Sequence, residues 1–306
     1  MGGGGRNISR ASPSLVSRPM SSLRTPLLLA AVLLAAAPQS FGGNEAPRSV
    51  AHTERSSASL ISDQTALSAG TSFWVGLRLV LAPGWHTYWR NPGDSGNPAR
   101  IEWELPEGVV AGALRWPRPE RIRTGPLMSF GYEGEVVLLT RMSALTVPAN
   151  AAAVSLRARA KWLVCAEICV PEGGDLFLEI PISPEAAPSS ASAAARIARF
   201  VSRMPLPSPE GATVSMGDHT IELRAPTVAF RPEAADDIWF FPGRYGWVDH
   251  AAPQPWRVSG GDLLLELTPG DMPLEPSASL EGVMAIRYRD GSESSWRVSA
   301  LPITVN

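Results

Sequence analysis

The chain has two cysteines, Cys165 and Cys169, which lie close together in the stretch WLVCAEICVPEGG with three residues between them. A pair of thiols can form a structural disulfide, exchange electrons with another disulfide, or bind a soft metal ion. The spacing alone is compatible with all three kinds of chemistry. The secondary structure predicted around the two cysteines is therefore needed to distinguish these three kinds of chemistry.

The residues before the pair alternate between apolar and polar side chains, which predicts a half-buried strand. The apolar positions are Val154, Leu156, Ala158, Ala160 and Trp162, and the polar ones are Ser155, Arg157, Arg159 and Lys161. Residues 166–168 then fit a three-residue hairpin loop, which would set Cys165 directly opposite Cys169. Cβ atoms at such a pair lie about 4.5–5.5 Å apart, against roughly 3.5–4.5 Å in a disulfide. A bond is therefore within reach, with some strain.

This bond would do little to stabilise the fold. It closes a loop of about five residues, worth roughly 2 kcal/mol, whereas a loop of about 100 residues would give nearly 5 kcal/mol. A strained bond at an exposed hairpin is typical of disulfides that take part in exchange. A structural staple and metal ligation remain as alternatives. The neighbours Lys161 and Glu167 predict no strong lowering of the thiol pKa.

The same alternation in residues 73–81, 101–105, 135–140 and 176–180 predicts further strands, with Pro- and Gly-rich turns between them. Residues 183–211 are rich in Pro, Ser and Ala and contain one short helical pattern, and strand patterns resume after them. We therefore expect an all-β protein with two tandem immunoglobulin-like antiparallel β-sandwiches. The first spans residues 44–183 and the second residues 212–306, joined by a linker with a short helix at 184–211. The stretch PGRYGW at 242–247 weakly resembles PGWHTYW at 83–89.

The N-terminal part, residues 1–43, reads as an extension followed by a secretory signal peptide. One Arg precedes an apolar run at 27–37, and small residues follow it. The run is too short to span a bilayer, which takes about 20 residues. The true start is expected at Met20 and cleavage near residues 40–43, with an uncleaved anchor as the alternative. We expect a periplasmic protein without a membrane span in its mature form, in an oxidising compartment where paired thiols form disulfides.

The composition argues against several other functions. A formal net charge of −2 leaves no basic surplus to neutralise the phosphates of a nucleic acid. No G-x-S-x-G, P-loop or dinucleotide-binding motif occurs in the sequence. Copper handling finds weak support, because the four histidines (His52, His86, His219 and His250) are scattered and the eight methionines form no repeat. We therefore expect no cofactor and no metal.

Three stretches together resemble the N-terminal periplasmic domain of DsbD-type thiol:disulfide interchange proteins. They are PGWHTYWRNPGDSGNPARIEWELPEG (83–108), FGYEGEVVLL (130–139) and KWLVCAEICVPE (161–172). The likeness covers about residues 48–182 and is to the branch that includes the copper-tolerance relative ScsB. The tail from there to residue 306 resembles the second sandwich of that branch. The resemblance implies an immunoglobulin-like domain that acts as a protein-disulfide reductase type of electron relay. The spacing departs from the enterobacterial type, whose cysteines are further apart.

The resemblance also implies roles for individual residues. Cys169 matches the cysteine that forms a mixed disulfide with a partner, and Cys165 matches the resolving cysteine. The segment SFGYEG (129–134) matches an aromatic cap loop with Phe130 or Tyr132 over the pair, hinged at Gly125, Gly131 and Gly134. Tyr88 and Trp89 match aromatics beside the disulfide. His86 is a candidate for proton transfer, with an ordinary hydrogen-bonded histidine as the alternative.

The partners that the resemblance implies are thioredoxin-like periplasmic proteins and a membrane electron carrier. Because the chain ends at Asn306 with no carrier, the carrier is expected on a separate chain. The alternative function is a non-catalytic periplasmic binding module for a redox or copper-handling partner, with a structural disulfide.

Overall fold

The computed structural model describes residues 49–303, except 149, 185, 186, 189, 190, 218, 273 and 276. The expected extension and signal peptide at 1–43 lie outside the described residues. The described residues belong to one compact unit, which spans residues 45–306. In this part of the chain no helix has the length and apolar character needed to cross a membrane.

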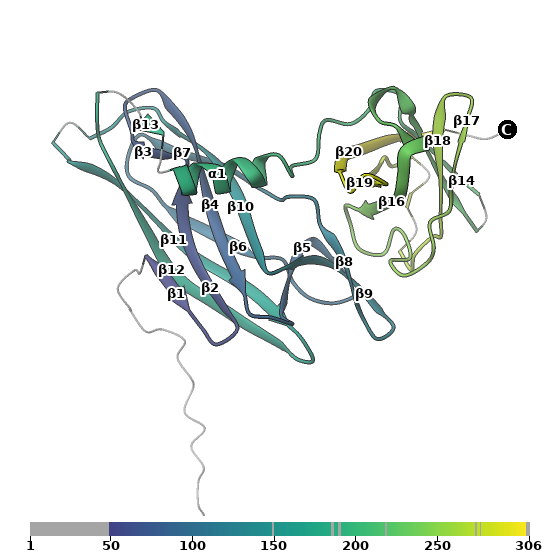
Figure 1. Cartoon of the computed structure of the whole chain (residues 1–306), viewed down its shortest axis with the longest axis horizontal. Helices are drawn as coiled ribbons and strands as arrows, with labels where there is room; N and C mark the ends of the chain where they lie inside the picture. Colours follow the sequence, from purple (N-terminus) through teal and green to yellow (C-terminus); the bar gives the residue numbers. More distant parts are fainter. Residues whose placement is uncertain are drawn as a thin grey trace, which may run out of the picture. The chain divides into compact units, whose positions relative to one another are not determined.

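Residues 50–182, here called the first β region, form two sheets that pack around one core (Figure 1). The five-stranded sheet has the order β1 (Val50–His52), β2 (Ser56–Ser62), β4 (Thr71–Leu81), β10 (Glu135–Ala144) and β7 (Val109–Arg115). The six-stranded sheet has the order β12 (Cys169–Pro181), β11 (Ala153–Cys165), β5 (His86–Gly93), β9 (Leu127–Glu133) and β8 (Glu120–Thr124), and β6 (Arg100–Glu104) pairs with β11. A short β3 (Gln64–Ala66) pairs with β13 (Ala187–Pro188).

The alternation of apolar and polar residues in the sequence explains which face of each strand is buried. In β11 the apolar series from Val154 to Trp162 is buried in the core, and Arg157, Arg159 and Lys161 are exposed. The predicted strand at 73–81 is found in β4, whose odd-numbered apolar side chains from Phe73 to Leu81 are buried. A period of two with one buried face is what a strand in a two-layer packing requires.

Helix α1 (Ala191–Val201) lies within the stretch predicted as a linker and packs against β10 and β2. Ile197 and Phe200 are buried in the core of the first β region. On the polar side Arg196 and Arg199 form ion pairs with Glu135 of β10. A short helix is therefore present within residues 184–211, as expected, and it packs on the first β region.

Residues 213–302, here called the second β region, contain one seven-stranded sheet. Its order is β16 (Ala235–Pro242), β19 (Leu280–Tyr288), β20 (Glu293–Pro302), β14 (Thr213–Met216), β15 (Ile221–Pro226), β18 (Asp262–Leu267) and β17 (Trp256–Ser259). The pair β14–β20 is parallel and the other pairs are antiparallel. Two short 3-10 helices, Thr227–Ala229 and Pro232–Ala234, precede β16.

The all-β class is confirmed, and the antiparallel pairing dominates as expected. The description as two tandem immunoglobulin-like sandwiches, and the domain boundaries given above, stay predictions. The core of the first β region also takes in side chains from the second, namely Trp239, Phe241, Val283 and Ala285. The two β regions are thus joined by a shared apolar contact as well as by the chain.

Candidate functional site

The two cysteines lie at the tip of the long hairpin formed by β11 and β12. The register pairs every residue from Ala153 to Cys165 with one from Pro181 to Cys169, without a shift. Residues 166–168 form the loop, in which the Ala166 N–H donates to the Ile168 carbonyl at 3.1 Å. The prediction that the loop sets Cys165 directly opposite Cys169 is confirmed. The two residues are joined by a disulfide, with their Cα atoms 4.1 Å apart.

The two sulfur-bearing residues differ in their access to solvent. Cys165 is buried, with 2% of its surface exposed, because β5 lies beside it in the sheet. Cys169 is exposed at the sheet edge, since β12 has no neighbour beyond it in the sheet. Next to Cys169 in the loop, the apolar Ile168 has 64% of its surface exposed. An incoming thiolate or protein can therefore reach Cys169 and not Cys165.

His86 lies beside the buried cysteine, as its cross-strand partner in the register. Because directly paired residues point to the same face of a sheet, the His86 imidazole shares a face with the disulfide. His86 is buried, and this burial lowers the pKa of its imidazole below the ordinary value of 6.5; the Glu133 carboxylate raises this pKa in part. The imidazole is therefore neutral at pH 7 and can accept a proton.

Tyr88 makes the polar contact to the exposed cysteine. Its hydroxyl lies 3.5 Å from the Cys169 Sγ, and it must be the donor because a disulfide sulfur carries no hydrogen. The Tyr88 side chain is 1% exposed, and its ring packs edge-on against His86 with centroids 5.2 Å apart. Burial raises the pKa of Tyr88, and a hydrogen bond from Ser95 opposes this shift. The neutral hydroxyl is thus retained as a donor to the sulfur.

The other predicted aromatics lie on the opposite face of the same strands. Thr87 pairs with Tyr132 while Tyr88 pairs with Gly131, so Tyr132 and Phe130 point away from the face that holds the disulfide. Phe130 packs against Phe241 of the second β region at 5.1 Å, and the Tyr132 hydroxyl donates to the Pro117 carbonyl. Among the described residues the side-chain hydrogen bond to the disulfide comes from Tyr88 and not from these two side chains. Their capping role stays a prediction.

Trp89 is buried on that same core side. Its ring also packs against Phe241, with centroids 6.3 Å apart, and the Arg90 guanidinium lies over it. Of the aromatics expected beside the disulfide, the structure therefore brings Tyr88 to the sulfur and assigns Trp89 to the contact with the second β region.

The segment expected as a cap loop is a strand. Residues 129–133 belong to β9, which pairs with β5 on one side and β8 on the other. Gly131 fits here because a Cβ at this position would collide with the Thr87 carbonyl of β5. Gly125 and Gly134 have positive φ values of 59° and 64° and lie at the two ends of β9. The glycines therefore permit close strand pairing and tight turns.

Three residues near the site were missed by sequence reasoning. Ser95 lies beside the Tyr88 hydroxyl. Asp94 accepts a hydrogen bond from the Met128 N–H at 2.7 Å and contacts His250 at 2.8 Å. The stretch NPGDSG was recognised as part of a motif, but a contact between residues 156 positions apart has no periodic signal in a sequence.

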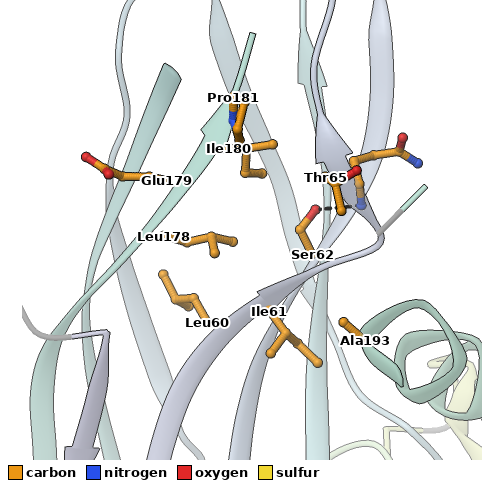
Figure 2. Close-up of a pocket in the computed structure, with 10 residues that line it drawn as sticks. Leu60, Ile61, Ser62, Thr65, Leu178, Glu179, Ile180, Pro181 and Ala193 are labelled. Atoms are coloured by element: carbon orange, nitrogen blue, oxygen red, sulfur yellow. Dashed lines mark hydrogen bonds between the residues drawn. The ribbon is translucent and has the colours of Figure 1, made fainter. Parts of the chain in front are cut away.

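Other possible sites offer less. No group of three or more His, Cys, Asp or Glu side chains suited to a metal ion occurs in the described ranges. A hollow of about 370 Å³ lies at the other end of β12 from Cys169, between Leu60, Ile61, Leu178 and Ile180 (Figure 2). Its lining is mainly apolar and includes no cysteine or histidine. Within the described residues the disulfide at the hairpin tip is therefore the strongest candidate for a functional site.

Comparisons with known proteins agree with this site. Residues 57–181, which include both cysteines, match the family model of the N-terminal part of the thiol:disulfide interchange protein DsbD. The N-terminal periplasmic domain of ScsB from Proteus mirabilis has a similar fold, with a TM-score of 0.57 at 16% identity over 82% of this chain and 95% of that chain. The reduced DsbD N-terminal domain of Neisseria meningitidis is 14% identical over 42% of this chain and 90% of that chain, with a TM-score of 0.25. No curated protein matches the sequence. Residues 57–181 therefore form a domain of the DsbD N-terminal type.

Proposed function

We propose that this protein is a periplasmic thiol–disulfide exchange module that relays electrons through Cys165 and Cys169. The observation that carries the proposal is the unequal access of the two cysteines: one sulfur is open to a partner and the other is buried directly behind it. Exchange needs one accessible sulfur for the mixed disulfide and a second thiol within bonding distance to resolve it.

The reaction balances without a cofactor. In the dithiol form, the Cys169 thiolate attacks one sulfur of a partner's disulfide, that bond breaks, and the partner's other sulfur leaves as a thiolate and takes up a proton. The Cys165 thiol then loses its proton and attacks the Cys169 sulfur, which releases the partner's second thiolate. The net transfer is two electrons and two protons from the module to the partner. A reduced donor restores the dithiol by the reverse sequence.

Two neighbours have clear parts in these steps. The Tyr88 hydroxyl donates to the Cys169 sulfur, and such a hydrogen bond stabilises a thiolate more than a neutral thiol. The neutral His86 imidazole, which lies beside Cys165, is suited to accept the proton that Cys165 loses before it attacks. Both residues favour the sulfur species that react.

The partners we propose are thioredoxin-like periplasmic proteins, with a membrane electron carrier as the donor. The family match supports exchange with disulfide proteins in general. The exposed Ile168 beside Cys169 supports docking of a protein, because an apolar side chain next to the reactive sulfur gives a partner a surface to bury.

The test is to trap the mixed disulfide. A Cys165→Ala variant keeps the attacking sulfur and lacks the resolving one, so we expect it to form a covalent adduct with periplasmic proteins that is lost on treatment with DTT. The matched control is the Cys165→Ala/Cys169→Ala double variant, which should form none. If the single variant yields no DTT-sensitive adduct, the proposal is wrong.

A further inference from the structure

The Tyr88 side chain borders the segment 91–96, which is the end of its own strand β5 and the turn after it. Ser95 lies beside the Tyr88 hydroxyl and partly offsets the rise of its pKa, and the Ser95 hydroxyl lies 3.3 Å from that of Ser129. Gly96, with a φ of 105°, lies so close to the Tyr88 ring that a Cβ there would overlap it. The segment 91–96 thus lies against Tyr88 at two places: Gly96 is next to the ring and Ser95 is next to the hydroxyl.

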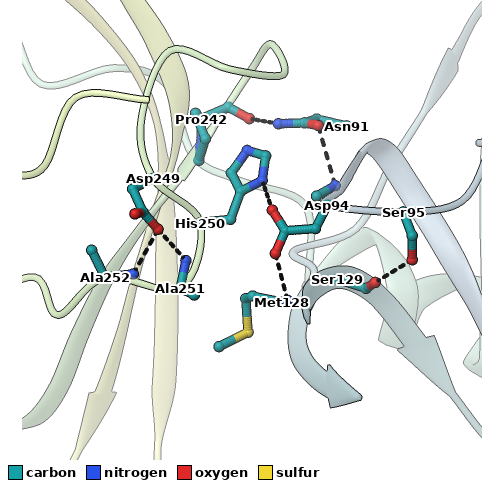
Figure 3. A network of polar contacts seen from close by, with 11 residues as sticks. Asn91, Asp94, Ser95, Met128, Ser129, Pro242, Asp249, His250, Ala251 and Ala252 are labelled. Carbon is teal, nitrogen blue, oxygen red and sulfur yellow. Dashed lines mark hydrogen bonds and ion pairs between the residues drawn. The ribbon is translucent and has the colours of Figure 1, made fainter. Parts of the chain in front are cut away.

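This segment is fixed in turn by the second β region (Figure 3). The Asn91 side-chain amide donates to the Pro242 carbonyl at 2.8 Å, and the Asp94 carboxylate accepts from the His250 Nδ1 at 2.8 Å. The other Asp94 oxygen accepts the Met128 N–H at 2.7 Å. Asp94 therefore connects the second β region to β9 and lies directly before Ser95.

His250 is well suited to hold Asp94 in one position. It is 4% exposed, and its ring packs edge-on against Phe130 and Tyr245 with centroids 5.0 and 5.5 Å apart. A carboxylate can only accept, so the Nδ1 of His250 carries the proton in this contact. A hydrogen bond in which the acceptor is charged is stronger than one between neutral groups.

We propose that His250 and Asp94 are positioning residues for the disulfide, which fix the segment 91–96 so that the Tyr88 hydroxyl points at the Cys169 sulfur. This inference rests on the proposed function and gives the second β region a part in it. The second β region contributes no reacting group, but it sets the position of the Tyr88 hydroxyl at the reacting sulfur. The contacts run from His250 through Asp94 and Ser95 to Tyr88 and then to the sulfur.

The experiment measures the reactivity of Cys169 in full-length protein. In a Cys165→Ala background, which leaves one thiol, the rate of alkylation by iodoacetamide is recorded against pH. We expect Tyr88→Phe to slow alkylation at pH 7 about fivefold and to move its pH midpoint upward, as the loss of one hydrogen bond to a thiolate would do. His250→Phe keeps the aromatic packing without the donor, and we expect it to slow alkylation about two- to threefold.

Two variants separate positioning from a general structural effect. His250→Asn restores a donor near the place of Nδ1, and we expect it to recover most of the rate. Glu293→Gln removes the ion pair with Arg118, another contact between the two β regions, and we expect the rate to stay unchanged. In a Tyr88→Phe background, His250→Phe should have no further effect, because it acts through Tyr88.

The inference is overturned if His250→Phe leaves alkylation unchanged while Tyr88→Phe slows it, or if His250→Phe slows it equally without the Tyr88 hydroxyl. It is also overturned if Tyr88→Phe has no effect. Because alkylation needs no protein partner, each of these results is distinct from a failure to trap an adduct, which would count against the proposed exchange function alone.

Discussion

The two β regions begin from similar sequence signals and end with different tasks. In the first, PGWHTYW at 83–89 leads into β5, which brings His86 and Tyr88 to the disulfide. In the second, PGRYGW at 242–247 starts at the last residue of β16 and continues as a loop. The first stretch supplies groups at the reactive sulfur, whereas the second belongs to the loop that meets the first β region.

The second β region also contains no cysteine. Its buried aromatic Phe241 packs against Trp89 and Phe130 of the first β region, while its Pro242 carbonyl and His250 hold the segment 91–96. A region without reactive groups can therefore still belong to the site, through the residues that fix the reacting ones.

The largest expected effect comes from the first β region. Cys169→Ala removes the accessible sulfur, so we expect complete loss of disulfide exchange, measured as reduction of a disulfide substrate by the pre-reduced protein. The free energy of unfolding should fall by only about 2 kcal/mol, because the lost loop is so short. Residual exchange through the buried Cys165 would contradict the assignment of the two roles.

The next effect tests whether the two β regions act as one unit. Phe241→Ala removes a buried ring from the contact between them, and we expect a loss of about 3–5 kcal/mol in the free energy of unfolding. Urea unfolding of the natural protein should show a single transition by fluorescence and circular dichroism. Two separate transitions, with only the second region affected, would show that the regions are independent.

A smaller effect concerns docking of a partner. Ile168→Ser removes the exposed apolar side chain beside Cys169, and we expect the KM for a thioredoxin-like substrate to rise about three- to fivefold while kcat stays unchanged. Leu301→Ser is the matched control in the second β region, since Leu301 is 62% exposed and Ile168 is 64% exposed. Equal effects of the two substitutions would argue against a docking role for the hairpin tip.

The smallest effect is a pH dependence from His86. Burial lowers its pKa below the ordinary 6.5, so the unfolded chain binds the proton more tightly than the folded protein does. The free energy of unfolding should therefore fall as the pH drops below about 6.5. We expect His86→Asn to reduce the difference in unfolding free energy between pH 7.5 and pH 5.5. An unchanged difference would mean that His86 titrates alike in both states.

The hairpin could be predicted from the sequence because its signals are local. The alternation of 154–162 sets the face, and the three-residue loop sets the register that brings Cys165 opposite Cys169. The apolar face of α1 was likewise visible in its helical spacing. Such patterns depend on neighbours within a few residues.

The rest of the site depends on contacts between distant strands. The family resemblance implied a cap loop at 129–134, but pairing with β5 and β8 makes residues 129–133 a strand. The face on which Phe130 lies follows from that pairing alone. The contact of His250 with Asp94 arises from the packing of two sheets, and no local pattern encodes it.

The most direct test of the proposed relay is the reduction potential of the Cys165–Cys169 disulfide in the full-length protein, measured by equilibration with DTT buffers. A bond that serves in exchange should be reduced at a potential above about −300 mV, within reach of thiol partners. A value well below about −300 mV would identify a structural staple and contradict the proposed relay.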